Sequence, residues 1–432
     1  MRFTALPGFR DVFPEVFARR RRIFGVWRDV ASRYGFEEYD GPPLEPLELY
    51  TQKSGDEIVG QLYHFTDKGG REVALRPEMT PTFARLVAER ASQLRKPIRW
   101  FTIPQLFRYE RQQRGRLREH FQLNVDIAGE PGPAADAEVI AVAVDILRAL
   151  GFGPGDVRVR VSDRRILVGA LTDGLGVKAD EVPGVLAALD RWERSREAAE
   201  EALAAVFAGD AARADAVLAF AAGLGKPEGL LDTPAAAPLR ECLDHLGAMG
   251  LRDFVDVDLR IVRGLAYYTG IVFELFDAQK SLRAICGGGR YDDLLKQLGG
   301  VDLPCVGFGM GDVVLGELLA ERDGPPAAEP SVDVFVATVT PEDRPAALAL
   351  VQALRGTGLR VEYALGKQAL RKQFELANAR GARWCIVLGP DERSQGVAVV
   401  KTLQDGTERR VALDALRRGD LGGPEPKQEP TT

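Results

Sequence analysis

Cysteine and histidine are scarce in this sequence, which has four cysteines and three histidines among its 432 residues. The cysteines lie far apart and form no CxxC pair, which argues against both a disulfide framework and a zinc site. The histidines show no metal-ligand spacing either. These residues are Cys242, Cys286, Cys305, Cys385, His64, His120 and His245. The sequence therefore predicts no metal centre built from its own side chains.

Long hydrophobic runs are also missing. No stretch approaches the length of about 18 consecutive apolar residues that a membrane-spanning helix needs. The opening residues, MRFTALPGFRDVFP, lack the basic-then-apolar order of a secretory signal. We therefore expect a cytoplasmic protein that has no membrane partner.

Neither of the common nucleotide-binding loops is present. The sequence contains no GxxxxGK[ST] phosphate loop. Gly307, Gly309 and Gly311 lie between a predicted strand and a predicted helix, but the third glycine comes one residue too early for a dinucleotide fingerprint. We interpret these glycines as allowing a strand and a helix to pack closely.

Net positive charge is absent as well, because 63 acidic residues against 57 lysines and arginines give a net charge of −6. This balance is not typical of a nucleic-acid-binding protein. Two regions differ from the average, since residues 95–120 and 358–420 each carry an excess of basic side chains. Such local excesses fit phosphate binding at chosen places, although ordinary solvated arginines explain either patch taken alone.

The remaining composition is that of a globular protein, with 45% hydrophobic and 28% charged residues. At roughly 150 residues per domain, the length predicts two to three domains. An alanine- and leucine-rich stretch at about 170–250 predicts a helical insertion, and 321–331 has the composition of a linker. Residues 332–420 alternate between strand and helix patterns, which predicts an α/β domain with parallel pairing, and 421–432 predicts a disordered tail.

The clearest pattern lies between residues 99 and 129, and it predicts an antiparallel hairpin with a basic tip. RWFTIPQLFRYE (99–110) alternates well enough to form one strand, and HFQLNVDIAG (120–129) alternates strictly. The second strand therefore has an apolar face and a polar face. The apolar set is Phe121, Leu123, Val125 and Ile127, and the polar set is His120, Gln122, Asn124 and Asp126.

Charged side chains on the first strand extend the polar face. Arg108 and Glu110 lie two residues apart, so their side chains share one side of the strand. If the polar faces of the two strands coincide, the surface suits a small zwitterionic ligand, with Arg108 binding a phosphate or carboxylate. The tip arginines 111, 114 and 116 suit a polyphosphate. An exposed sheet with internal Arg–Glu pairs explains this segment equally well when it is taken alone.

A third candidate element is VRGLAYYTG, which spans Val262–Gly270. Arg263 with Tyr267 and Tyr268 suits a flat polar ring and its charge, although a glycine-rich turn with core aromatics is an alternative. No Ser–His–Asp or Cys–His arrangement is indicated, so covalent catalysis has no obvious nucleophile.

Taken together, these segments resemble those of the histidine–tRNA ligase family of class II aminoacyl-tRNA synthetases over nearly the whole chain. FRYERQQRGRLREHFQ (107–122) resembles motif 2, and YGFEEYDGPPLE, with Pro42 and Glu45, resembles motif 1. VRGLAYYTG and GGRYD (288–292) resemble two segments peculiar to the histidyl family. The further matching segments are GFRDVFP (8–14), RPEMT (76–80) and RKQFELANARGARWCIVLGPDE in the C-terminal region.

The resemblance implies an α+β fold, in which an antiparallel class II catalytic sheet is flanked by helices. It implies a catalytic domain over 1–320 that contains the helical insertion, and an anticodon-binding α/β domain over 332–420. It also implies a homodimer with a motif 1 interface. The implied reaction is the ATP-dependent formation of histidyl-adenylate, followed by transfer of histidine to tRNA(His), with Mg²⁺ accompanying ATP.

The resemblance also implies roles for individual residues. Arg108 and Arg263 would be catalytic, acting on the α-phosphate and on the reacting carboxylate. The residues that would bind histidine are Glu78, Thr80, Gln122, Asp126, Tyr267 and Tyr268. The residues that would bind ATP are Arg108, Glu110, Arg116, Phe121 and Arg290, with Phe121 stacking on adenine.

Several positions depart from the family pattern. The family commonly has aspartate at Ala266, glutamate at Asp126, glycine at Asn124 and proline at Gln112. Motif 3 normally ends in an arginine that binds the γ-phosphate, and Val314 occupies that position in GFGMGDVVL. The loss of such a contact costs about 1.5–3 kcal/mol, so we expect another cation, Arg116 or Arg290, to replace it.

Two other functions compete with the ligase. One is a non-catalytic paralogue that binds histidine and regulates a histidine-biosynthetic enzyme, which the altered motif 3 favours. The other is a synthetase-like RNA-binding protein without aminoacylation. The C-terminal domain and the combination of Arg108, Gln122 and Arg263 favour the ligase, because a histidine sensor needs no arginines that face phosphate.

Overall fold

The computed structural model describes residues 3–51, 59–110, 115–192, 195–224, 228–261, 267–279, 282–324 and 332–422. The chain divides into two compact units, Met1–Gly324 and Pro325–Thr432. Within the described residues, no helix is both long and apolar enough to cross a membrane. All four cysteines are buried free thiols. In the same part of the chain, no cluster of three or more His, Cys, Asp or Glu side chains has the arrangement of a metal site.

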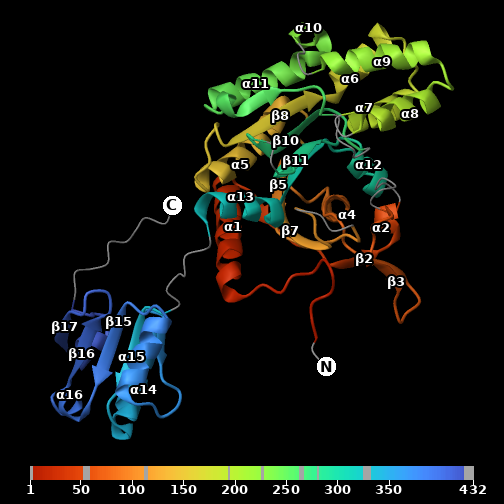
Figure 1. Cartoon of the computed structure of the whole chain (residues 1–432). Coiled ribbons are helices and arrows are strands. Elements are labelled where there is room, and N and C mark those ends of the chain that lie inside the picture. Colours follow the sequence, from red (N-terminus) through yellow and green to blue (C-terminus); the bar gives the residue numbers. More distant parts are fainter. Residues whose placement is uncertain are drawn as a thin grey trace. The chain divides into compact units, whose positions relative to one another are not determined.

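A nine-stranded, mostly antiparallel sheet forms the centre of the first unit in the described residues (Figure 1). Its order is β1-β5-β7-β12-β11-β10-β8-β9, and β6 pairs with β7 beside this path. Only the outer pairs β1–β5 and β8–β9 are parallel among these strands. The strands are β1 (Glu37–Glu38), β5 (Ile98–Thr102), β6 (Gln105–Phe107), β7 (Glu119–Ala128), β8 (Val157–Asp163), β9 (Val255–Val257), β10 (Ile271–Asp277), β11 (Cys286–Arg290) and β12 (Cys305–Gly311). The expected antiparallel catalytic sheet flanked by helices is confirmed.

Helices α1 (Pro14–Arg33), α5 (Pro133–Ala149) and α13 (Asp312–Asp323) pack together on one face of this sheet (Figure 1). Their apolar side chains share a core with the apolar set of β7, in which Leu123 and Val125 are fully buried. The expected apolar face of this strand therefore faces the core. Burial of this kind stabilises the fold by roughly 25 cal/mol for each Å² of apolar surface.

Smaller elements complete the first unit. A three-stranded sheet has the order β2-β4-β3. Helix α2 packs against β2 and α4, and α12 packs against α4. These elements are β2 (Leu44–Pro46), α2 (Glu48–Thr51), β3 (His64–Thr66), β4 (Glu72–Leu75), α4 (Thr80–Arg90) and α12 (Leu294–Gly299).

The expected helical insertion is present. After β8 the chain forms a run of helices, of which α7, α8 and α9 pack side by side and α11 packs on α5 (Figure 1). The helices are α6 (Arg164–Gly169), a π-helical turn (Ala170–Gly174), α7 (Val182–Trp192), α8 (Arg196–Val206), α9 (Ala211–Gly223), α10 (Glu228–Leu231) and α11 (Ala237–Ala248), with short 3₁₀ turns at Pro234–Ala236 and Arg252–Phe254.

Some strand boundaries differ from the sequence-based expectation. The alternation over 99–110 is divided into β5 and β6, because Pro104, which has no N–H to donate, lies between them. The glycine-rich segment CGGGR is strand β11, and glycine is needed there, since a Cβ on Gly288 would lie 2.2 Å from the carbonyl oxygen of Gly307.

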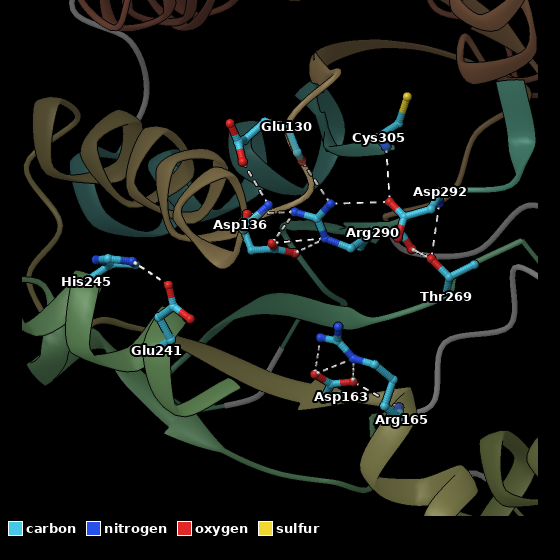
Figure 2. A network of polar contacts seen from close by, with 11 residues as sticks. Glu130, Asp136, Asp163, Arg165, Glu241, His245, Thr269, Arg290, Asp292 and Cys305 are labelled. Carbon is cyan, nitrogen blue, oxygen red and sulfur yellow. Dashed lines mark hydrogen bonds and ion pairs between the residues drawn. The ribbon is translucent and has the colours of Figure 1, made fainter. Parts of the chain in front are cut away.

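Arg290 at the end of β11 is the centre of a buried polar network (Figure 2). Its Nε and Nη2 donate to the carboxylate of Asp136 in the first turn of α5, and both side chains are 2% exposed. Its Nη1 donates to the carbonyl oxygen of Glu130 at 3.1 Å, and its Nη2 to that of Gly132 at 3.1 Å. Asp292 accepts from Arg290 and from the backbone N–H of Cys305. The GGRYD segment therefore joins β11 to the start of α5 and to β12.

The second unit is a five-stranded α/β sheet of order β14-β13-β15-β16-β17 in the described residues. The parallel pairing expected here is confirmed for β14, β13 and β15, whereas β16 and β17 add antiparallel strands. Its cores involve only residues of this unit. The elements are β13 (Val334–Thr338), a 3₁₀ turn (Pro341–Asp343), α14 (Arg344–Gly356), β14 (Val361–Tyr363), α15 (Leu370–Ala379), β15 (Trp384–Leu388), α16 (Pro390–Ser394), β16 (Val397–Thr402), β17 (Glu408–Ala412) and α17 (Leu413–Arg417).

Candidate functional site

The polar face of β7 opens onto a cavity of about 1250 Å³. Gln122, Asn124 and Asp126 line this cavity, whereas their apolar neighbours on β7 are buried in the core under α5. One strand thus separates the core from the cavity. Every residue predicted to bind histidine lies along this space, namely Glu78, Thr80, Gln122, Asp126, Tyr267 and Tyr268.

The glycines of β12 make room for the polar side chains of β7. Gly307 pairs with Asp126, and a Cβ at this position would lie 2.0 Å from the Oδ1 atom of Asp126. A Cβ on Gly309 would lie 2.7 Å from the Cδ atom of Gln122. The side chains of β7 therefore lie across β12. The glycines serve this strand–strand contact rather than the strand–helix packing expected from the sequence.

Asp126 lines the cavity and is 4% exposed. Burial raises its pKa to about 7, and the opposing effect is the hydrogen bond that the Tyr291 hydroxyl donates to its Oδ1. Burial and the nearby Asp126 hold the pKa of Tyr291 well above its usual value. Tyr291 follows Arg290 in the GGRYD segment, and no sequence pattern indicates that its hydroxyl contacts Asp126.

Glu78 and Tyr267 approach each other beside this carboxylate. The Tyr267 hydroxyl donates to Oε2 of Glu78 at 3.4 Å, and burial raises the pKa of Tyr267 well above its usual value. The ring of Tyr267 also contacts those of Tyr268 and Tyr291, with centroids 5.1 Å and 5.8 Å away. Carboxylates and hydroxyls thus surround a space lined by aromatic rings.

Arg108 follows β6, and two hydrogen bonds to backbone carbonyl oxygens hold it at the cavity. Its Nε donates to the carbonyl oxygen of Pro77 at 2.8 Å, and its backbone N–H donates to the carbonyl oxygen of Arg118 at 3.0 Å. Nη1 of Arg108 lies 3.9 Å from Glu110, and Nη1 of Arg116 lies 3.0 Å from the other oxygen of Glu110. All three charged side chains line the cavity, as expected.

Phe121 lies elsewhere, and the structure does not support its predicted contact with adenine. Its ring packs against Phe24 of α1, with centroids 5.2 Å apart, and the guanidinium of Arg20 lies 5.1 Å from its centroid. His120, on the opposite face of β7, lines the cavity. Burial, and then the positive charges of Arg108 and Arg10, lower the pKa of His120 to about 3, so its ring is neutral. The strict alternation of polar and apolar residues along β7 places His120 and Phe121 on opposite faces of the strand, and this pattern is visible in the sequence.

Arg290 is also not among the described residues that line the cavity. Its guanidinium is used by Asp136 and by two carbonyl oxygens, so the structure gives it a contact that supports the fold rather than a phosphate contact. Arg263, Ala266, Gln112 and the tip arginines 111 and 114 lie outside the described residues. The predicted role of Arg263 stays a prediction.

A buried ion network lies behind the cavity and joins the N-terminal segment to it. Arg10 donates to Glu119 at 2.6 Å and to Asp312 at 3.2 Å. Asp312, the first residue of α13, also accepts from the backbone N–H of Phe121 at 2.9 Å. The expected GFRDVFP segment thus fixes the start of β7 against the start of α13.

Two family models match the chain. The histidyl-tRNA synthetase family matches residues 8–311, and an anticodon-binding domain matches residues 333–418. The first match covers all described residues that bear predicted roles and every residue that lines the cavity except Val313 and Val314. The second coincides with the α/β sheet of the second unit.

Curated relatives give the same family, and a solved structure shares the fold. A histidine–tRNA ligase of Opitutus terrae is 47% identical over 96% of this chain and 97% of its own length. A histidine–tRNA ligase of Haloarcula marismortui is 40% identical over 98% of both chains. A histidyl-tRNA synthetase structure from Nostoc sp. PCC 7120 is 24% identical, has a TM-score of 0.78 and covers 97% of this chain and 100% of its own, which supports the shared fold.

The raised pKa of Asp126 predicts how pH affects stability. The folded protein keeps a proton on Asp126 up to about pH 7, whereas the unfolded chain loses it near pH 3.9. Between these values unfolding releases a proton, so the free energy of unfolding falls by up to about 1.4 kcal/mol per pH unit because of this residue. We expect calorimetry of the wild type and of Asp126→Asn to show a stability difference that falls toward pH 7 and is flat above it.

Tyr291→Phe provides the control for this titration. The Tyr291 hydroxyl favours the ionised form of Asp126, so the loss of this hydroxyl should raise the pKa of Asp126 further. The pH above which the stability difference stays constant should then be higher. A stability difference that does not depend on pH between 4.5 and 8 would show that Asp126 titrates normally.

Proposed function

The chain belongs to the histidyl-tRNA synthetase family, and from that premise we propose that it attaches histidine to tRNA(His) in two steps that use this cavity. In the first step an oxygen of the histidine carboxylate forms a bond to the α-phosphorus of ATP. The bond from that phosphorus to the bridging oxygen breaks, and its electron pair leaves with pyrophosphate. In the second step a hydroxyl of the terminal ribose of tRNA attacks the histidyl carbonyl, and AMP leaves.

The observation that carries this proposal is the single cavity lined both by Arg108 and by the groups predicted to bind histidine. Catalysis of this reaction needs mainly positioning and charge stabilisation, so a nucleophile on the protein is not required. Arg108, held by Pro77 and by its own strand, would neutralise the α-phosphate. We also retain Arg263 as the partner of the reacting carboxylate, as the resemblance implies.

Histidine would lie at the enclosed end of the cavity. Glu78, Thr80 and Gln122 would bind its ammonium group. Asp126, with Tyr267 and Tyr268, would bind the imidazole, which has one donor and one acceptor nitrogen in its neutral form. Such groups discriminate strongly against a ring that lacks those nitrogens, because buried polar atoms would then have no partner.

The nucleotide would lie between Arg108 and the turn at Gly115. Glu110 would contact the adenine amino group, and Arg116 would bind the outer phosphates. His120 replaces Phe121 as the flat side chain on which adenine would stack, because it is the one that lines the cavity. Its neutral ring at physiological pH suits this stacking.

Magnesium would arrive with ATP. Mg²⁺ in phosphoryl-transfer sites is bound largely by phosphates and water, with one or two carboxylates. The described residues contain no cluster that would form a complete protein site, which fits this mode. Glu274 lines the cavity and is a carboxylate that suits one of the remaining positions. The bound ion would neutralise charge on the phosphates.

The second unit would bind the anticodon of tRNA(His), in line with the anticodon-binding model that it matches. We place the catalytic domain at 1–320, with its insertion at about 170–250, a linker at 321–331 and the anticodon-binding domain at 332–420. The competing function, a histidine-binding regulatory paralogue, is not favoured, since the relatives at 40–47% identity over nearly the whole chain are histidine–tRNA ligases. A cytoplasmic location stays a prediction.

Histidine-dependent exchange of pyrophosphate into ATP tests the proposed function. The purified full chain should catalyse exchange only when histidine is present. Arg108→Ala should reduce the rate by about 100-fold, because the charge on the α-phosphate loses its main partner. Arg196→Ala, on the exposed surface of α8, is the matched control and should retain the wild-type rate. Folded wild-type protein that binds histidine without any exchange would favour the regulatory paralogue.

Two neighbouring variants test the nucleotide position. His120→Ala should raise KM for ATP by about tenfold, the size of one lost base-stacking contact, and leave KM for histidine within about twofold. Phe121→Ala should lower the melting temperature instead, since its ring packs against α1. Steady-state kinetics and calorimetry measure both. The reverse pattern would return the adenine contact to Phe121.

We further propose a homodimer. Phe3, Leu6 and Phe13 lie close together in the sequence just before α1 and are 89%, 69% and 67% exposed, and large exposed apolar side chains suit an interface with a second copy of the chain. Sedimentation equilibrium should give twice the chain mass of 47.1 kDa. Leu6→Asp combined with Phe13→Asp should shift the protein toward the monomer. A wild-type monomer at micromolar concentration would refute the dimer.

A further inference from the structure

Where α13 begins, the described residues of that helix and of the end of β12 that line the cavity have no charged side chain. Gly311, Val313 and Val314 line it there, and Val314 is 8% exposed. A nucleotide triphosphate that occupies the cavity brings several negative charges, which need guanidinium or ammonium partners. The partner for this region must therefore come from another segment of the chain.

Arg283 lies beside this apolar patch. It belongs to the turn between β10 and β11, its side chain is exposed, and it lines the same cavity. A Cβ built on Gly115 would lie 3.3 Å from Cγ2 of Val314 and 3.8 Å from Cδ of Arg283. Both side chains thus reach one point beside Gly115, in the turn that follows the basic hairpin tip. Arg283 therefore carries its charge next to the position where Val314 has none.

Four other described arginines of the region bind carboxylates at other positions. Arg160 and Arg260 line the cavity, and both donate to Asp258, each through Nε at 2.8 Å. Arg116 is paired with Glu110, and Arg290 is buried with Asp136 and does not line the cavity. Arg283 differs from these four in its position, because it lines the cavity beside Val314, where α13 begins.

We propose that Arg283 binds the outer phosphates of ATP from the β10–β11 turn and thereby supplies the charge that residue 314 lacks. This inference rests on the proposed function. When the α-phosphorus gains its bond to the histidine carboxylate, the departing pyrophosphate takes the electron pair of the broken bond. Arg283 stabilises that leaving group, and in the reverse direction it helps to bind pyrophosphate.

Substitution of Arg283 tests the contact. Arg283→Ala should lower kcat/KM for ATP by about ten- to a hundredfold, the effect of losing a charge-assisted bond to phosphate. It should raise KM for pyrophosphate in the exchange reaction to a similar extent and leave KM for histidine within about twofold. Arg283→Lys, which keeps the charge without the fork of donors, should lie between the two. Arg196→Ala on α8 is the matched control.

A stable sulfamoyl analogue of histidyl-adenylate separates phosphate binding from structural damage. The analogue has no β- or γ-phosphate, so Arg283→Ala should bind it within about threefold of wild type by calorimetry. An equal loss for ATP and for the analogue would mean that Arg283 only supports the shape of the cavity, and the inference would be overturned.

The strictest test moves the positive charge from residue 283 to residue 314. Val314→Arg places a guanidinium on the first turn of α13, so it should restore ATP use in the Arg283→Ala background by at least about tenfold. Normal ATP kinetics for Arg283→Ala would overturn the inference and leave the proposed function intact. Absence of histidine-dependent exchange in the wild type would overturn both. If Arg283→Ala does not fold, Arg283→Gln serves in the same assays.

Discussion

The two faces of β7 determine the rest of the catalytic unit. Because side chains alternate along a strand, ten residues supply both the apolar layer under α5 and the polar lining of the cavity. A slip of one residue in the pairing with β12 would exchange these two sets, placing Asp126 in the core and Val125 in the cavity. The register is therefore fixed by burial on one side and by ligand chemistry on the other.

Close packing between strands makes this arrangement possible. The polar side chains of β7 extend over β12. The glycines of β12 have no side chains, so they leave the space that these polar side chains occupy. The same absence of side chains on β11 allows its neighbours to approach. Ion networks then hold the strands from behind, with Arg290 joining β11 to α5 and Arg10 joining β7 to α13.

Sequence reasoning reached much of the site, and its errors have physical reasons. Arg108, Gln122 and Asp126 were placed together because a two-residue period on paired strands leaves little choice. The same period already put His120, and not Phe121, on their face, so the assignment of Phe121 by resemblance alone was the weaker argument. Arg290 was assigned to ATP because it is an arginine in a characteristic motif, and a motif does not tell which way a side chain points. No motif or spacing in the sequence indicated a role for Arg283.

The alternation of β7, the helical insertion, the α/β character of the second unit and the family of the chain all follow from its linear pattern of residues. Each of these depends on local periodicity or on motifs that neighbouring residues carry together. Three other features are properties of the folded chain: the set of arginines that face the cavity, the hydrogen bond from Tyr291 to Asp126, and the approach of the β10–β11 segment to the start of α13. Those facts depend on contacts between residues far apart in the chain, and packing and burial settle them rather than any pattern along the sequence.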